Sequence, residues 1–441
     1  MSLYLPSYGR APTNPQFGRG WVEAPDIAEV HRDFRLIVLN GALFILAFTF
    51  INPGIVLSAF IYELTGSDVH VGLVNALFGV GWFWPQIFVS HLVQHRQRKM
   101  PFYRLAVFLR VGGIATITLL TFLMGGRGFQ AFFWVFLFFL FFYSSSGGIG
   151  MVPWADIVGK VVPLEERARL FSLRQFYGGI LAFLAGFLVQ YVLSERSGLA
   201  FPYNYGVLFG LSTAFVVAGL GVFLLVREPV HPVPKRRRSF WGHMADGPRL
   251  LKRDLDYRKY LLARVLWSFG MMGIPFYVPY AIDRLGVQPS AVGTFLSVSM
   301  ASRVLSNLIW GRLGRRGNRR ILAAGTFLIS SGALWAGVVQ FLPEGMRMAG
   351  YLVTFVASGA GVTAINIANI AYLLEIAPSQ IRPTYVGFIN TFAAPLTLVP
   401  LLAGFAIRYI SYPSLFLVSS VFGLASTSVA LSLSRNRTTG M

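Results

Sequence analysis

Twelve apolar runs, each long enough to cross a lipid bilayer, restrict this sequence to the folds that a membrane permits. A spanning helix needs about 20 mostly apolar residues in succession. The runs cover residues 34–58, 70–93, 105–124, 129–152, 173–193, 204–226, 259–281, 289–310, 320–342, 346–373, 384–407 and 412–433. They lack the apolar/polar alternation of a membrane β-barrel. Helices are then the structures that can satisfy the backbone N–H and C=O groups of these runs inside lipid. Because only 12% of the residues are charged, against about a quarter in soluble domains, we predict an all-α membrane protein with twelve transmembrane helices.

Basic residues gather on alternate loops, and this asymmetry predicts the orientation. The rich loops hold clusters at 96–99, 160–174, 235–238, 252–259 and 312–320. The opposite loops hold only Arg127, Arg196, Arg284 and Arg347. An excess of Lys and Arg marks the cytoplasmic side, so we expect a multi-pass protein of the plasma (inner) membrane with both termini in the cytoplasm. The net charge of +21 does not predict nucleic-acid binding, because no basic patch lies on a foldable soluble domain.

A weak internal repeat divides the chain into two halves. Val71-Gly72 begins the second run and Val292-Gly293 begins the eighth, at equivalent places. Pro163 with Arg167 follows the fourth run, as Pro378 with Arg382 follows the tenth. The predicted domains are a cytoplasmic segment 1–33, a six-helix bundle 34–226, a cytoplasmic linker 227–257, a six-helix bundle 258–434 and a tail 435–441. Parallel halves of this kind are typical of transporters whose solute site lies between them.

The loop after the eighth run resembles the signature of the major facilitator superfamily, Gly-x-Leu-x-Asp-Arg-x-Gly-Arg-Lys. The residues that fit it in type are Gly311, Leu313, Arg316, Arg319 and Arg320. In the first half, only Leu92, Arg98 and Lys99 fit. The resemblance implies the major facilitator fold of two pseudo-symmetric six-helix bundles, and transport of a small solute by alternating access. The family's acidic fifth position is Gln94 in one half and Arg315 in the other, so its usual carboxylate latch is missing.

Other charged groups must then stabilise the alternative conformations of the transporter. Asp156 and Glu375 end the fourth and tenth helices beside basic clusters. We predict that they form a gate with Arg167, Arg382, Arg316 and Arg319, pairing in one state and separating in the other. The alternative is an ordinary interfacial acid that pairs with a nearby Arg and contributes little.

Polar residues inside the runs mark candidate positions for a solute, because they are costly in lipid and usually face the interior of a bundle. The predicted solute-binding residues are Asn40, Tyr143, Gln175, Arg303, Asn366 and Asn369. For each of them, hydrogen bonding between helices is the alternative. Arg110 and Arg264 lie close enough to helix ends to snorkel, whereas Arg303 lies in a polar stripe and is expected to meet an anion.

The distribution of charge favours a neutral, amphipathic or anionic solute. None of the seventeen acids, and no His, falls in the middle third of a run, so we expect no mid-membrane carboxylate for proton coupling. No catalytic motif is present, and we predict neither an enzyme nor a cofactor or metal. The expected partners are a small solute and the lipid bilayer, with no nucleic acid, around a monomer. The alternative function is a non-transporting membrane assembly or scaffold protein on the same fold.

Overall fold

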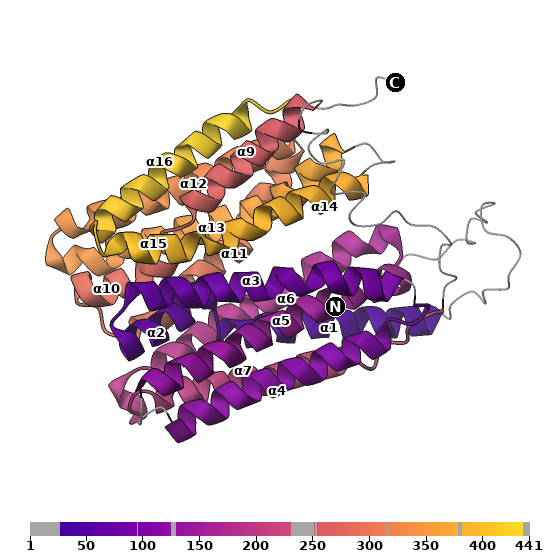
Figure 1. Cartoon of the computed structure of the whole chain (residues 1–441), viewed down its shortest axis with the longest axis horizontal. Helices are drawn as coiled ribbons and strands as arrows, with labels where there is room; N and C mark the ends of the chain where they lie inside the picture. Colours follow the sequence, from indigo (N-terminus) through magenta and orange to yellow (C-terminus); the bar gives the residue numbers. More distant parts are fainter. Residues whose placement is uncertain are drawn as a thin grey trace, which may run out of the picture.

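The computed structural model describes residues 27–94, 96–124, 129–230, 251, 254–315, 317–377 and 382–434, and within them it contains helices and no strand. The N-terminal half consists of α1 (Ile27–Thr49), η1 (Pro53–Leu57), α2 (Ser58–Thr65), α3 (Asp68–Gln94), α4 (Met100–Met124), α5 (Phe129–Val161), α6 (Leu164–Val192), η2 (Glu195–Ser197) and α7 (Tyr203–Phe223). The C-terminal half consists of α9 (Leu255–Gly270), η3 (Ile274–Phe276), α10 (Tyr277–Leu285), α11 (Ala291–Gly314), α12 (Asn318–Val338), η4 (Val339–Phe341), α13 (Glu344–Ile376), α14 (Arg382–Ala393), η5 (Ala394–Leu398), α15 (Val399–Ile407) and α16 (Tyr412–Leu431). Figure 1 shows the two halves as two helical bundles that lie side by side.

The predicted architecture of twelve membrane-spanning segments is confirmed. Eleven helical segments of the described chain are long and apolar enough to cross a membrane, and a shorter apolar helix supplies the twelfth. The first span joins α1 to α2, and the seventh joins α9 to α10. The eleventh span is interrupted by η5, because Pro395 and Pro400 lack the backbone N–H that a continuous helix needs.

Equivalent contacts at the ends of each half give the sequence repeat a structural basis. Near the start of α1, Asp33 accepts a hydrogen bond of 3.1 Å from the backbone amide of Arg227, which follows α7. In α9, Asp256 accepts one of 3.3 Å from the backbone amide of Ser434, which follows α16. Each carboxylate therefore ties the first helix of its half to the segment that follows the last helix.

The halves meet differently at the two ends of the molecule. We call the end where α3 leads to α4 and α11 leads to α12 the basic end, because Lys99 and Arg319 lie there. We call the opposite end, where α2 leads to α3 and α15 leads to α16, the sealed end. At the sealed end one apolar core is continuous across both halves, from Val71 of α3 to Ala403 of α15. In the N-terminal half this core continues to the basic end through Met100 and Val161, whereas the C-terminal half has a separate core near that end, and the described residues of the two do not merge there.

Two helix crossings close the sealed end. Helix α3 packs on α15, and α6 packs on α11. A Cβ atom added to Gly72 would lie 2.4 Å from the carbonyl oxygen of Pro400, and one added to Gly293 would lie 2.4 Å from that of Gly186. Since these are backbone contacts, only glycine permits such an approach at the two positions. The sequence repeat at Gly72 and Gly293 therefore marks two equivalent crossings between the halves.

Candidate functional site

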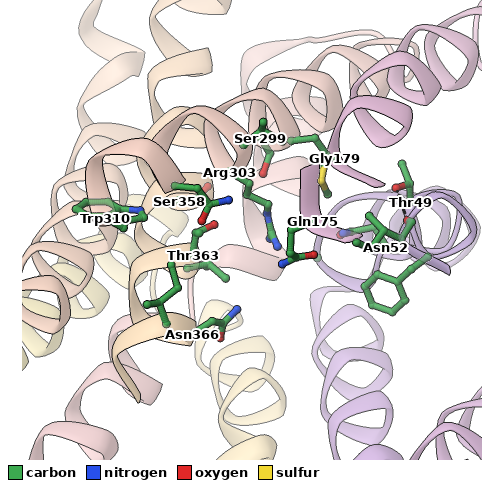
Figure 2. Close-up of a pocket in the computed structure, with 18 of the residues that line it drawn as sticks. Thr49, Asn52, Gln175, Gly179, Ser299, Arg303, Trp310, Ser358, Thr363 and Asn366 are labelled. Carbon is green, nitrogen blue, oxygen red and sulfur yellow. Dashed lines mark hydrogen bonds between the residues drawn. The ribbon is translucent and has the colours of Figure 1, made fainter. Parts of the chain in front are cut away.

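A cavity of about 1490 Å³ lies between the two halves. The N-terminal half contributes residues of α1, η1, α3 and α6 to its wall, and the C-terminal half contributes residues of η3, α11, α12 and α13. Polar side chains from both halves face it, and Figure 2 labels Thr49, Asn52, Gln175, Ser299, Arg303, Ser358, Thr363 and Asn366 among them. The apolar part of the wall includes Phe44, Phe48, Met271 and Phe355. The cavity can therefore solvate polar groups and also hold an apolar surface.

The charged side chains that line the cavity are both positive. Among the described lining residues, Arg174 of α6 and Arg303 of α11 carry charge, and no Asp, Glu or His is present. The Nε of Arg303 is buried and has no hydrogen-bond partner in the described part of the chain. Figure 2 shows Arg303 and Gln175 extending toward the middle of the cavity from opposite halves. A guanidinium that is free to donate suits a carboxylate, a phosphate or another strong acceptor.

The cavity is closed at the sealed end and extends to the basic end. Its wall continues along α11 to Gly314 and onto Asn318, the first residue of α12. At the other end, the hydroxyl of Tyr412 donates a hydrogen bond of 2.6 Å to Asp68 across the halves. The hydroxyl of Ser297 likewise donates to the backbone oxygen of Phe183 at 2.9 Å, joining α11 to α6. In this conformation the cavity is therefore closed at the sealed end and reaches the basic end.

Three of the six predicted solute-binding residues meet in this cavity: Gln175, Arg303 and Asn366. Asn40 instead donates to the backbone oxygen of Gly219 at 2.8 Å, within the N-terminal bundle. Tyr143 is fully buried in that bundle. The side-chain oxygen of Asn369 accepts hydrogen bonds from Tyr260 and, at 2.5 Å, from Nη1 of Arg264. The structure therefore does not bring Asn40, Tyr143 and Asn369 to the central wall.

The snorkelling predicted for two arginines is wrong. Arg110 is only 4% exposed and lies within the N-terminal bundle. Arg264 binds Asn369 and lies over the ring of Trp267, with 5.3 Å between its Cζ and the ring centroid. Both side chains find hydrogen-bonding and aromatic partners inside their own bundle, so neither has to reach the interface.

Arg174 and Asn52 line the cavity but were absent from the predicted set. The fifth apolar run begins at residue 173, which predicted a position for Arg174 at the membrane interface. Helix α6 begins at Leu164, after Pro163 and with Glu165 and Glu166 in its first turn. Ten further residues at about 1.5 Å each carry Arg174 roughly 15 Å along the helix. The proline and the two acids are the sequence signal for a helix start, and counting from them gives the depth of Arg174 in the membrane.

The predicted gating residues form contacts within their own halves. Asp156 pairs with Lys160 at 2.9 Å, and Lys160 also pairs with Glu228 at 2.7 Å. Arg167 donates to the backbone oxygen of Gly159 at 2.6 Å. Glu375 accepts from Asn318 at 3.0 Å, and Arg319 donates to the backbone oxygen of Leu433 at 2.6 Å. Arg316 and the side chain of Arg382 lie outside the described residues.

Neutralising the two gating acids is expected to increase the time that the basic end spends open. In the double variant Asp156→Asn, Glu375→Gln, no carboxylate at these positions can pair with the facing basic loops when that end closes. The readout is labelling of Asn307→Cys, in the cavity wall, by an impermeant maleimide, since the chain has no natural cysteine. Faster labelling than with the control Glu344→Gln is expected. Equal rates in both backgrounds would leave the acids as plain interfacial groups.

Sequence and structure comparisons place the chain among transporters. A family model described as Major Facilitator Superfamily matches residues 37–288 and 260–440. The fold is similar to that of a variant of the nucleoside transporter NupG, with 12% identity, a TM-score of 0.69 and coverage of 91% of this chain and 99% of that chain. It is also similar to a D-xylose-proton symporter, with 14% identity, a TM-score of 0.68 and coverage of 92% and 98%. The E. coli fucose:proton symporter FucP gives 16% identity, a TM-score of 0.57 and coverage of 91% and 98%. At such identities the likeness establishes the fold alone, and no curated protein matches the chain in sequence.

Proposed function

Because the chain belongs to the major facilitator superfamily and is a multi-pass membrane transporter, we propose that it carries a small anionic or neutral amphipathic solute by alternating access. The observation that supports this solute class is the charge of the central cavity. Two arginines and no carboxylate line its described wall. A cationic solute would be repelled there, whereas an anion gains charge-assisted hydrogen bonds. The aromatic and aliphatic part of the wall suits a solute with an apolar body.

We further propose that the basic end faces the cytoplasm of a plasma membrane. The support is the excess of Lys and Arg in the loops at that end. In this orientation the described conformation faces inward, and segment 1–33, linker 227–257 and tail 435–441 are cytoplasmic. Transport then requires the crossings of α3 with α15 and of α6 with α11 to open while the basic end closes.

Transport is expected to proceed without a titratable carboxylate in the passage. The acids nearest to it are engaged elsewhere: Glu63 accepts a hydrogen bond of 2.5 Å from Tyr205, Asp156 pairs with Lys160, and Glu375 binds Asn318. The response of uptake by proteoliposomes to an imposed pH gradient should therefore change little when Glu63→Gln, Asp156→Asn or Glu375→Gln is introduced. Uptake of a cationic dye driven by a pH gradient, and abolished by any one of these changes, would contradict this prediction.

The proposed solute class is tested with purified protein in proteoliposomes. Radiolabelled organic acids, neutral amphipathic compounds and organic cations are offered at equal concentration, and empty liposomes correct for passive entry. We expect saturable uptake of members of the first two groups and none of the third. Uptake confined to cations overturns the proposal, and uptake of no compound in a broad panel favours a non-transporting assembly or scaffold protein.

A further inference from the structure

A second, smaller cavity lies within the N-terminal bundle and shares part of its wall with the central cavity. Its volume is about 230 Å³, several times the roughly 30 Å³ that one water occupies in the liquid. All six spans of the N-terminal half contribute to its wall, through residues that include Asn40, Trp82, Arg110, Trp154, Arg174 and Leu220. This cavity, which we call the chamber, is therefore formed by one bundle and is large enough for a small organic molecule.

Two guanidinium groups line this chamber without a carboxylate. Arg110 of α4 is 4% exposed, and Arg174 of α6 lies opposite the first helix. No Asp, Glu or His of the described chain lines the chamber. Two unneutralised cations inside a membrane-embedded bundle are costly, and such charges are normally paired. An anion bound in the chamber would neutralise them.

The protein partners of the two arginines leave hydrogen-bonding capacity unused. Arg110 lies between aromatic rings, with its Cζ 4.9 Å from the centroid of Phe44 and 4.6 Å from that of Tyr143. Its Nη2 donates a long hydrogen bond of 3.4 Å to the hydroxyl of Tyr143, but its Nε is buried and has no hydrogen-bond partner in the described part of the chain. Nη1 of Arg174 donates to the side-chain oxygen of Asn40 and to the backbone oxygen of Ile37, both at a long 3.3 Å, and the guanidinium lies over Trp154. Ring faces hold the two guanidiniums in place, but they do not neutralise them.

Glycine makes the space that both arginines occupy. A Cβ added to Gly147 would lie 2.3 Å from Nη1 of Arg110, and one added to Gly41 would lie 2.3 Å from Nε of Arg174. The backbone of α5 and of α1 is therefore shaped around the two guanidiniums. This is a built recess, and the remaining wall is apolar, through residues such as Ala106 and Val107.

We propose that this chamber binds a small organic monocarboxylate, with the carboxylate held by Arg110 and Arg174 and the apolar body against the aromatic wall. A planar carboxylate matches the fork of a guanidinium. The apolar remainder of the wall selects against a fully hydrated inorganic anion. Phe44 and Arg174 also line the central cavity, so the occupant lies next to the transport pathway. The proposal concerns equilibrium binding and does not rest on the proposed transport function.

Binding is measured on the purified full-length protein by isothermal titration with indole-3-acetate and benzoate. Indole-3-acetamide is titrated as the matched neutral ligand, and inorganic phosphate is titrated as an inorganic anion for comparison. We expect a saturable site for at least one carboxylate, with an affinity about tenfold or more above that for the amide. Equal affinity for acid and amide, or binding of phosphate alone, overturns the proposal.

Substitutions locate the site. Arg110→Gln is expected to weaken carboxylate binding about tenfold or more, and Arg110→Lys to weaken it less, because charge remains but the fork is lost. Arg264→Gln, in the other bundle and outside both cavities, should leave the affinity unchanged. Thermal unfolding of each variant shows whether it is folded, and Arg110→Lys keeps the test valid if Arg110→Gln is not. Loss of binding in Arg303→Gln alone would assign the carboxylate to the central cavity and refute the chamber site.

Discussion

Replacing Gly293 with valine is expected to hold the transporter open at its sealed end. A Cβ at this position would lie 2.3 Å from the backbone nitrogen of Gln190 and 2.4 Å from the carbonyl oxygen of Gly186. Neither atom can rotate away, because both belong to the backbone of α6. Overpacking of this kind costs about 1–3 kcal/mol. Since about 1.4 kcal/mol is a factor of ten, the ratio of sealed to open conformations should fall roughly tenfold or more.

The measurement is reaction of a single introduced cysteine, Asp68→Cys, with an impermeant maleimide added at the sealed end. We expect the Gly293→Val background to react about tenfold faster than the background with native Gly293. Gly112→Val is the matched control, because a Cβ at Gly112 in α4 meets no atom within 4 Å. Normal folding of Gly293→Val together with labelling at the control rate would show that close contact at Gly293 does not keep the sealed end closed.

Replacing Arg303 with glutamine is expected to remove most anion transport and to spare neutral solutes. Arg303 comes from the C-terminal half, extends into the cavity and has a buried Nε without a partner in the described chain. Loss of one partner from a hydrogen-bonded charge pair costs about 2–5 kcal/mol. At about 1.4 kcal/mol for each factor of ten, anion uptake at low concentration should fall at least about thirtyfold.

The readout is the initial rate of uptake for an organic acid and for a neutral amphipathic compound, in the same proteoliposomes. Arg303→Lys should retain part of the anion rate, because it preserves the charge without the fork. Arg347→Gln, near the sealed end of α13, serves as the control for removing a positive charge. A parallel fall for acid and neutral compound would show that Arg303 acts on folding or on conformational change and not on recognition of charge.

The fold was predictable because its signals are local and repeated. Each apolar run is visible in about 20 consecutive residues, and Gly72 and Gly293 recur at equivalent places. Backbone contact at the sealed end explains that recurrence. The break in the eleventh span was harder to place, since Pro395 and Pro400 lie in a run that stays mostly apolar on both sides of them.

The site was only partly predictable, because it depends on helix rotation and on partners distant in sequence. Arg303, Gln175 and Asn366 were identified from polar stripes, which report the inward face of a helix. The same reasoning cannot separate a cavity wall from a bundle interior. Asn369 follows Asn366 on nearly the same face, yet Arg264 and Tyr260 bind its side chain. Such pairing depends on how α9 and α13 pack together, so the sequence of neither helix alone shows it.

If solute passes between the two halves, the sealed end must open once in each transport cycle. Cross-linking across that end measures whether it does. The variant Asp68→Cys, Tyr412→Cys places thiols where a hydrogen bond of 2.6 Å now joins α3 to α16, in a chain with no other cysteine. Uptake of a transported organic acid is measured in proteoliposomes before treatment with a short, reducible bifunctional thiol reagent, after it, and after reduction. We expect cross-linking to stop uptake and reduction to restore it, and we expect neither single-cysteine variant to respond. Undiminished uptake through a fully cross-linked protein would contradict it.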